Sequence, residues 1–320
     1  MRLLFLTSTR IGDAVLSTGL LDTFVRRHPG LRVTVVAGAP AAPLFRAVPG
    51  LESVIVLRKR PYNAHWPRLW RQVVGRRWDI VVDLRASALS YLLRARQRHV
   101  VGRRGGNDRH RVAELGDLLG LDPPPVPRVW LDEVARARAA AAIPGGAGPV
   151  LALGPAANWA GKQWPATRFA ALAGRLTAPD GPLPGARVAV LAAGGERPQA
   201  QPLLDSLPPA RRLDLVGALD LPEAAACLQR CALFVGNDSG LMHLAAAAGT
   251  PTLGLFGPTP DTRYRPWGAH AAFVRTPESF PDLHAQARRH PATSHTLMDG
   301  LSVETVVAKA RAMVGESVLP

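Results

Sequence analysis

Short runs of β-branched residues and leucine alternate along the chain with segments whose apolar residues recur at helical spacing. One such unit is the run Val150–Gly154, which is followed by the helical pattern Ala166–Leu176. This alternation predicts parallel sheets with helices on their faces. The last helical pattern covers Val303–Val314. The expected strands are Leu3–Leu6, Arg32–Val36, Ser53–Val56, Ile80–Asp83, His99–Gly102, Val150–Gly154, Arg187–Leu191, Leu213–Val216, Leu233–Gly236 and Thr252–Phe256.

Two proline- and glycine-rich passages, residues 122–127 and 144–149, separate the first five expected strands from the last five. Since 320 residues exceed the usual size of one domain, an interdomain connection is expected there. We therefore expect an α/β protein of two Rossmann-like domains facing a cleft, over residues 1–145 and 146–320. In such sheets ligands bind beyond the carboxyl ends of the strands, so the loops that follow strands carry the candidate chemistry.

Apolar residues make up 47% of the chain, but no uninterrupted apolar run is long enough to span a bilayer. The N-terminal segment meets charge too early for a signal peptide and is expected to form a strand. These features predict a cytoplasmic protein. Cys227 and Cys231 lie four residues apart in a helical pattern without nearby histidine or cysteine partners, which favours buried free thiols over a metal pair.

The net charge of +15 is concentrated in the first half of the chain. Residues 1–145 hold 24 Lys and Arg against 11 Asp and Glu, whereas residues 146–320 hold 15 against 13. One domain is therefore expected to attract a polyanion, for which nucleic acid, an anionic membrane and a phosphorylated glycolipid all qualify. For any single cluster, solvated guanidinium groups on the surface are the alternative. The arginines considered for anion binding are Arg10, Arg58, Arg60, Arg103 and Arg104.

A strand, a tight polar turn, a short helix and a second strand follow one another in the segment that ends at Gly257. The turn Asn237-Asp238-Ser239-Gly240 consists of residue types that cap helices, and free amides at a helix N-terminus attract phosphate. Gly257 follows the second strand and would place a glycine loop beside this turn. The segment suggests a nucleotide or nucleotide-sugar site, with helix capping alone as the alternative.

Lys162 lies in another loop that follows an expected strand. The sequence Gly161-Lys162 invites comparison with a phosphate-binding P-loop, but Ala156 stands where that motif needs glycine and Gln163 where it needs serine or threonine. The chain has three lysines against 36 arginines, so a lysine here is unusual. A compact ammonium suits a point contact on a diphosphate, and a simple exposed lysine is the alternative. Trp164 is expected to pack in the core.

Asp13 follows the first expected strand and precedes a helix that is expected to begin near Ala14. Its structural role would be to cap this helix. Its functional role would be that of a general base, because a carboxylate held by polar neighbours can accept the proton of an attacking hydroxyl. Both roles are compatible.

These loops together resemble glycosyltransferase family 9, whose best-known members are the ADP-heptose:lipopolysaccharide heptosyltransferases. The resemblance covers about residues 1–270 and rests on Gly12-Asp13, Asn158–Pro165, and the run Asn237–His243 with Phe256–Pro258. It implies a GT-B fold, an acceptor-binding N-terminal domain, a donor-binding C-terminal domain, and inverting transfer without a metal or other cofactor. In such folds the last helix often packs back across the domains. Residues 275–295 match no pattern of use here and are expected to form a surface insertion.

The resemblance also implies roles for single residues. Asp13 would act as the base, Lys162 and the turn at Asp238–Gly240 would hold the donor diphosphate, and Glu196 is similar to a carboxylate that contacts the ribose. For His243, a satisfied histidine facing the sheet is the alternative. The donor-binding residues expected on this basis are Asn158, Lys162, Glu196, Asp238, Ser239, Gly240, His243 and Gly257, and the acceptor would meet Arg10, Arg58, Arg60, Arg103 and Arg104.

The implied reaction moves a heptose or related sugar from a nucleotide diphosphate sugar, ADP-heptose in the family, to a hydroxyl of the lipopolysaccharide inner core. The expected partners are this donor, the anionic glycolipid acceptor and the cytoplasmic surface of the inner membrane. A transferase of the same fold with another donor or acceptor stays open. A basic nucleic-acid-binding protein is the alternative of a different class, but the arginines are not interleaved with aromatic residues, so no nucleic acid is expected.

Overall fold

The computed structural model describes residues 1–58, 61–102, 108–146, 148–289 and 295–318. The chain divides into two compact units, Met1–Asp132 and Glu133–Pro320. The sequence placed this boundary at 145/146 instead. The difference is helix α5 (Glu133–Ala142), which packs on α8 (Leu221–Leu228) and therefore belongs to the second unit. The Pro- and Gly-rich passage at 144–149 lies inside the second unit, between α5 and its first strand.

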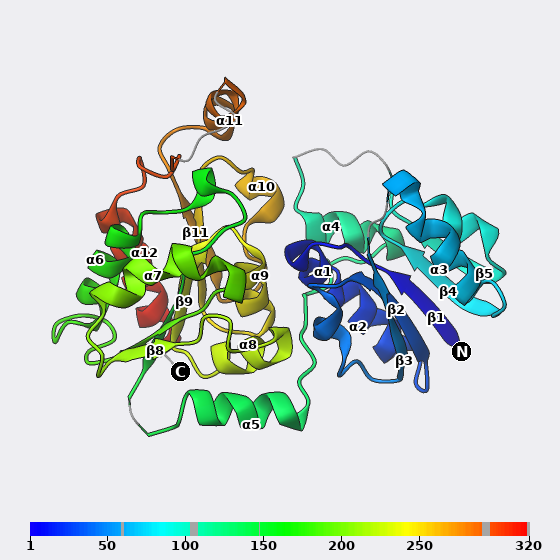
Figure 1. Ribbon diagram of the computed structural model, residues 1–320, viewed down its shortest axis with the longest axis horizontal. Coiled ribbons are helices and arrows are strands. Elements are labelled where there is room, and N and C mark those ends of the chain that lie inside the picture. The colour runs from blue at the N-terminus through cyan, green and yellow to red at the C-terminus, as the bar shows by residue number, and fades with distance from the viewer. Residues whose placement is uncertain (59–60, 103–107, 147, 290–294, 319–320) are drawn as a thin grey trace. The chain divides into compact units, whose positions relative to one another are not determined.

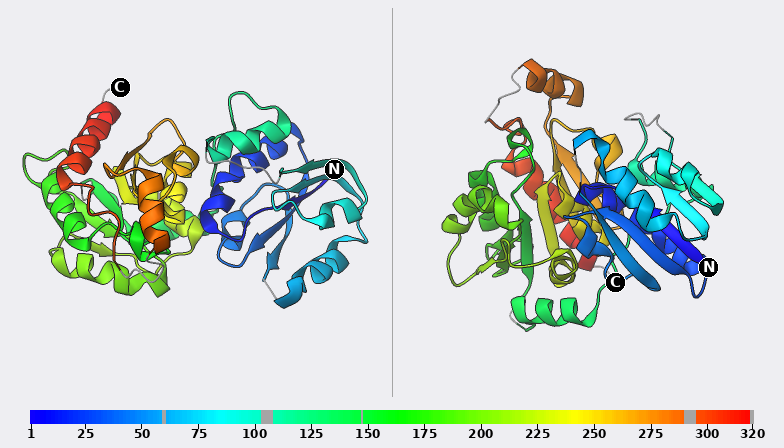
Figure 2. Two further views of the ribbon diagram at one scale, coloured as in Figure 1. Left: turned by 90° about the horizontal axis from the view of Figure 1, so that it is seen from above. Right: turned by 45° about the vertical axis from the view of Figure 1, so that its right-hand side comes forward.

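The first unit is a five-stranded parallel sheet in the order β3-β2-β1-β4-β5. Side chains alternate between its two faces, so apolar residues on both faces are buried under helices. Helix α3 packs on one face, and α2 and α4 lie on the other (Figures 1 and 2). Its elements are β1 (Arg2–Leu6), α1 (Ile11–Leu16), α2 (Thr18–Arg27), β2 (Arg32–Gly38), β3 (Leu51–Leu57), α3 (His65–Val73), β4 (Trp78–Asp83), η3 (Ala88–Leu92, a 3-10 helix), β5 (Ala95–Val100) and α4 (Arg111–Gly116).

The second unit is a six-stranded parallel sheet in the order β11-β10-β9-β6-β7-β8. Both sheets reverse their strand order beside the first strand, as doubly wound folds do. The elements are β6 (Val150–Gly154), η5 (Ala160–Lys162, a 3-10 helix), α6 (Ala166–Thr177), β7 (Arg187–Val190), α7 (Arg197–Ser206), β8 (Arg212–Asp214), α8, β9 (Leu233–Asn237), α9 (Gly240–Ala247), β10 (Thr252–Phe256), α10 (Asp261–Tyr264), β11 (Ala271–Arg275), α11 (Phe280–Arg289) and α12 (Val303–Val318).

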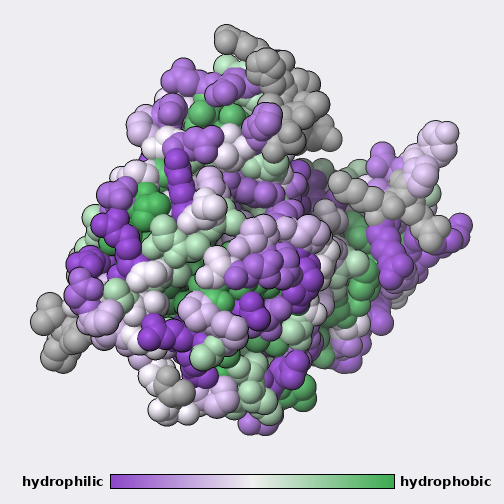
Figure 3. Space-filling model, turned by 60° about the vertical axis from the view of Figure 1, so that its left-hand side comes forward, coloured by the Kyte–Doolittle hydropathy of each residue, from purple (hydrophilic) through white to green (hydrophobic). Residues whose placement is uncertain are grey.

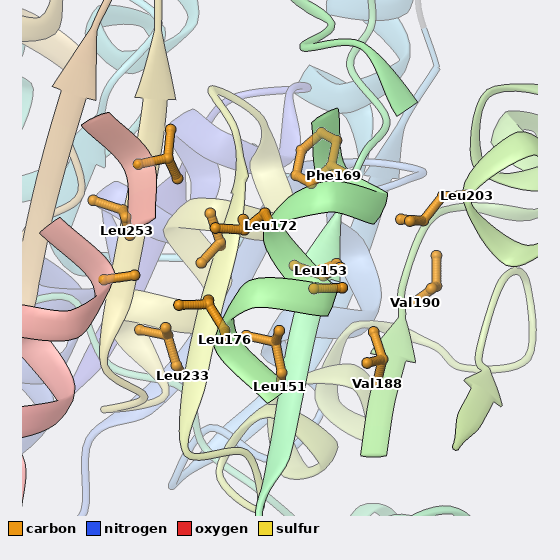
Figure 4. Close-up of a cluster of buried hydrophobic side chains, with 14 of the residues drawn as sticks. Leu151, Leu153, Phe169, Leu172, Leu176, Val188, Val190, Leu203, Leu233 and Leu253 are labelled. Atoms are coloured by element: carbon orange, nitrogen blue, oxygen red, sulfur yellow. The ribbon is translucent and has the colours of Figure 1, made fainter. Parts of the chain in front are cut away.

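The core of the second unit lies between its sheet and helices α6, α7 and α12. Figure 4 shows Phe169, Leu172 and Leu176 of α6 directed at apolar residues of the strands, among them Leu151 and Leu153 of β6. These side chains are fully buried. Burial of this kind contributes about 1.5 to 3 kcal/mol per large side chain, and it fixes the strand ends whose loops carry the candidate site.

Several sequence expectations differ from the structure. Strand β5 was expected at His99–Gly102 and is found at Ala95–Val100, and β8 was expected at Leu213–Val216 and is found at Arg212–Asp214. Strand β11 was not expected, because its five residues AAFVR begin with two alanines and lack a β-branched run. Residues 275–295 are not simply a surface insertion, since Arg275 ends β11 and Thr276 is buried. Helix α1 begins at Ile11 rather than near Ala14. Helix α12 packs on α6 and β11 of its own unit.

The surface seen in Figure 3 is mainly hydrophilic, with small apolar areas between the polar residues. Across the described part of the chain, no helix combines the length and the apolar character that a membrane span requires. Cys227 and Cys231 are free and buried, as expected, and burial raises the pKa of their thiols to about 11 and about 12.

Candidate functional site

Lys162 and Asp238 form an ion pair at the carboxyl edge of the second sheet. Lys162 ends η5 in the loop after β6, and Asp238 directly follows β9, the strand beside β6. The Lys162 Nζ lies 2.9 Å from the Asp238 Oδ2, and the two side chains are only 15% and 9% exposed. The pair therefore joins two of the three loops that the sequence singled out, and it holds the ammonium at a defined place.

Asn237 ties the Lys162 loop to β9. This residue is fully buried. Its Oδ1 accepts from the Trp164 amide at 3.0 Å, and its Nδ2 donates to the Pro155 carbonyl at 2.7 Å. Both ends of the loop are thus fastened by one side chain. The sequence treated Asn237 as a capping residue, and the structure corrects this to a bridge between loops.

The N-terminus of α9 lies next to this ion pair. Gly240 begins the helix, and Ser239, its N-cap, makes no side-chain cap hydrogen bond. The first amides of a helix have no intrahelical acceptor and carry partial positive charge. Both residues are partly exposed, so these amides and the ammonium of Lys162 belong to one positively polarised edge.

His243 lies in the first turn of α9 and is buried. Its Nε2 is 4.0 Å from the Asp238 Oδ1. The Asp238 carboxylate thus faces Lys162 on one side and His243 on the other. The Asp238 carboxylate is therefore held between two side chains of its own unit.

The remaining expected donor residues have separate surroundings. Asn158 is exposed in the Lys162 loop, and Glu196 accepts from the Ala193 amide with its Oε2, at 2.9 Å, as part of a helix start. A Cβ added at Gly257 would lie 2.5 Å from the Met298 Sδ, so a larger residue there would require the buried Met298 side chain to shift. Trp164 is buried and stacks edge-on against Phe169, which confirms its packing role.

Asp13 lies in the first turn of α1 at the corresponding edge of the first sheet. Arg10 is the N-cap of this helix, so Asp13 is not the capping residue. Its carboxylate is partly exposed and accepts from the Ser8 hydroxyl at a long 3.4 Å. Within the described ranges, no ion pair involves Asp13. The carboxylate is therefore partly accessible.

Comparison with known proteins decides the family. The sequence model of glycosyltransferase family 9 (heptosyltransferase) matches residues 95–292. The chain belongs to glycosyltransferase family 9. This confirms the resemblance and the expectation of a glycosyltransferase. The family 9 match includes Lys162 and Asp238 and begins after Asp13.

Relatives and solved structures extend this assignment. The chain is 32% identical to lipooligosaccharide heptosyltransferase 2 of Haemophilus influenzae over 40% of this chain and 36% of that protein, and 25% identical to lipooligosaccharide heptosyltransferase 2 of Haemophilus ducreyi over 86% and 88%. The glycosyl transferase family 9 structure from Veillonella parvula aligns with a TM-score of 0.79 at 21% identity, over 98% of this chain and 97% of that one. E. coli ADP-heptose lps heptosyltransferase II aligns with a TM-score of 0.77 at 19% identity, over 99% of both chains. These likenesses confirm the predicted GT-B fold class.

The expected acceptor arginines of this family 9 chain are only partly visible. Arg10 and Arg58 are exposed, and Arg60, Arg103 and Arg104 fall outside the described residues. In sequence, the first unit as a whole holds 22 Lys and Arg against 10 Asp and Glu. Among the described residues, no three His, Cys, Asp or Glu side chains are grouped so that they could hold a metal ion.

Arg85 is a candidate that the sequence did not single out. It follows β4, the strand beside β1, and its guanidinium carbon lies 5.3 Å from the centroid of the Trp66 ring. Burial lowers the pKa of Arg85, and the nearby Asp83 charge partly opposes this shift. Trp66 comes from α3, so only the folded chain brings the two side chains together. An arginine two residues after an expected strand was the available signal.

Proposed function

We propose that this family 9 protein is an inverting, metal-independent heptosyltransferase that transfers a sugar from a nucleotide diphosphate heptose, ADP-heptose, to a hydroxyl of the lipopolysaccharide inner core. The names of the relatives, which are lipooligosaccharide and lipopolysaccharide heptosyltransferases, support the sugar and the acceptor class. The proposal therefore names one donor and one class of acceptor, which can be assayed together.

The observation that carries the proposal is the buried Lys162–Asp238 ion pair beside the start of α9. A nucleotide diphosphate gains negative charge as its bond to the sugar breaks. Fixed cations and backbone amides stabilise such charge without reorganisation. In the proposed reaction, Lys162 and the amides at Ser239 and Gly240 contact the diphosphate, and Asp238 positions the lysine.

Asp13 supplies the second half of the proposed chemistry. Its carboxylate takes the proton of the acceptor hydroxyl while the hydroxyl oxygen bonds to the anomeric carbon and the diphosphate departs with the bonding electrons. Attack on the face opposite the leaving group inverts the anomeric configuration. Asn158, Glu196, His243 and Gly257 are proposed to shape the rest of the donor site.

The first unit is proposed to bind the acceptor. Its excess of arginine would attract the phosphate and carboxylate groups of an inner core, and Arg10, Arg58, Arg60, Arg103 and Arg104 are the proposed contacts. This proposal includes a cytoplasmic protein in peripheral contact with the inner membrane and without a nucleic-acid partner.

The test is a turnover assay with purified protein, ADP-heptose and a heptose-free inner-core glycolipid in the presence of EDTA. We expect ADP release together with a heptose-sized mass gain of the glycolipid, and NMR of the product should show inversion. UDP-glucose and GDP-mannose serve as matched donors. Turnover only with one of these would replace the proposed donor, and loss of activity in EDTA that Mg²⁺ restores would contradict metal independence. Salt-dependent RNA or DNA binding without any sugar transfer would instead favour the nucleic-acid alternative.

A further inference from the structure

Arg85 lies at the loop edge of the first sheet that also carries Asp13. Strands β1 and β4 are parallel neighbours with Leu6 opposite Asp83, and the Leu84 amide donates to the Leu6 carbonyl at 2.9 Å. The loops after these two strands therefore leave the same edge of the sheet side by side. Asp13 follows one strand and Arg85 the other.

The backbone of the Arg85 loop is fixed by the buried carboxylate of Asp83. The Arg85 amide donates to the Asp83 Oδ1 at 2.8 Å, and the amide and hydroxyl of Ser87 both donate to its Oδ2. Ala86 between them has a φ of +50°, a left-handed conformation that is uncommon for residues other than glycine. Three hydrogen bonds hold the loop in this conformation, and the Arg85 guanidinium lies over the Trp66 ring.

The guanidinium of Arg85 is partly buried without an acidic partner. Its Nε–H is buried and donates to no acceptor of the protein, and no carboxylate in the described ranges lies within ion-pair distance. Burying a charged donor without an acceptor costs free energy. Arg168, Arg187 and Arg212 are also partly buried and donate to backbone carbonyls, whereas three other partly buried arginines each have a carboxylate partner. These pairs are Arg46 with Asp132, Arg111 with Glu114, and Arg275 with Asp261.

We propose that Arg85, stacked on Trp66, is an anion subsite that binds a phosphate or carboxylate group of the acceptor on the loop beside Asp13. The planar guanidinium matches either group with two parallel hydrogen bonds, and the ring keeps the fork in one orientation. The bound anion supplies the partner that the protein does not. Arg85 belongs to the first unit, whereas Lys162 belongs to the second, so this subsite is assigned to the unit proposed to bind the acceptor, and the assignment rests on the proposed function.

The kinetic test compares Arg85→Gln, Arg85→Lys and Arg71→Gln. Arg71 is an exposed arginine of α3, the helix that carries Trp66, and it is the matched control. We expect Arg85→Gln to raise the acceptor KM by about 10- to 100-fold with the donor KM unchanged, since charge-assisted hydrogen bonds of this kind are lost. Arg85→Lys should fall between, and Arg71→Gln should match wild type. Equal changes in both KM values, or none, would overturn the subsite.

The chemical identity of the anion follows from two modified acceptors. With a dephosphorylated acceptor or a carboxyl-reduced acceptor, the penalty of Arg85→Gln should disappear in the one case in which the recognised group has been removed. A penalty that persists with both groups removed would show that Arg85 only supports the loop. If Arg85→Gln does not fold, Trp66→Leu keeps the charge, removes the ring, and should raise the same KM by a smaller factor.

A binding measurement separates this inference from the proposed function. In a Lys162→Ala background, which removes the cation of the second unit, inorganic phosphate should raise the melting temperature, and Arg85→Gln but not Arg71→Gln should abolish the rise. If phosphate stabilises the Lys162→Ala protein as expected but the wild type transfers no sugar, the anion subsite is supported and the proposed activity is refuted. Sugar transfer combined with phosphate stabilisation that is the same in Arg85→Gln would do the reverse.

Discussion

At the carboxyl edge of the second sheet the cation Lys162 has a carboxylate partner inside the protein, whereas at the same edge of the first sheet Arg85 has none. The acids differ in the same way. Asp238 is buried between Lys162 and His243, but Asp13 is partly exposed with a long contact to Ser8. The cation and the acid of the second sheet's edge pair with each other inside the protein, whereas Arg85 and Asp13 at the edge of the first sheet form no ion pair in the described ranges. Under the proposed function, the second unit would supply a fixed contact for the donor, and the first would use Asp13 for proton transfer and Arg85 for anion binding.

The accessible acid of the first unit gives the largest expected effect. We expect Asp13→Asn to lower kcat by about 10²- to 10⁴-fold with an unchanged melting temperature, because an amide cannot act as a general base. Asp108→Asn removes an exposed acid of the same unit and should leave kcat unchanged. A kcat for Asp13→Asn within a few-fold of wild type would remove Asp13 from the reaction and leave the first edge without its base.

The compensated pair of the second unit comes next. Lys162→Ala should lower kcat/KM for the donor by about 10²-fold, as loss of one charge-stabilising group does, with little change in the acceptor KM. Lys309→Ala is the control, since Lys309 is the other lysine whose position is described.

If Asp238 acts through Lys162, then Asp238→Asn should cost activity in the wild type and almost none in the Lys162→Ala background. Independent losses that add in the double variant would instead place Asp238 on the donor itself and end its interpretation as an internal partner.

The rigidity of the second edge is measured by the free energy of unfolding. Asn237→Ala leaves the Trp164 amide and the Pro155 carbonyl without their partner, and we expect a loss of about 2 kcal/mol in chemical denaturation. The exposed Asn158→Ala should stay within about 0.5 kcal/mol of wild type. Similar values for the two variants would mean that the bridge does not hold the loop.

The smallest effect concerns the exposed arginines of the first unit. Arg10→Gln and Arg58→Gln should each raise the acceptor KM about two- to threefold at low ionic strength, and added NaCl should reduce the difference because exposed charges are screened. Arg211→Gln, in an exposed position of the second unit, should have no effect. A change in the acceptor KM that added NaCl does not reduce would contradict an electrostatic role of these two exposed arginines.

The parts of the fold that follow from local pattern were predictable. Strand β6 was predicted with its observed ends, because a proline precedes it and a glycine and proline end it. Strand β11 was not predicted, because its five residues begin with two alanines and show no clear strand pattern. The start of α1 was placed too late because Arg10, its N-cap, contributes no capping side chain.

The sequence predicted which loops carry the candidate site, but it did not predict which side chains contact each other there. Lys162 and Asp238 both follow strands, so their common edge could be inferred, but that one neutralises the other depends on which strands are neighbours. Arg85 and Trp66 are brought together by the packing of α3 on the sheet. No spacing in the sequence encodes that contact.

Because the Asn237 side chain binds both Pro155 and Trp164, residues 155–164 form a loop whose two ends are held together by one side-chain amide. Its two ends are held in place whatever sequence lies between them. Substitutions within the loop should therefore leave strand β6 and helix α6 in place. An exchange of this segment with one of another sequence, with Asn237 retained, is therefore expected to leave the fold of the second unit unchanged.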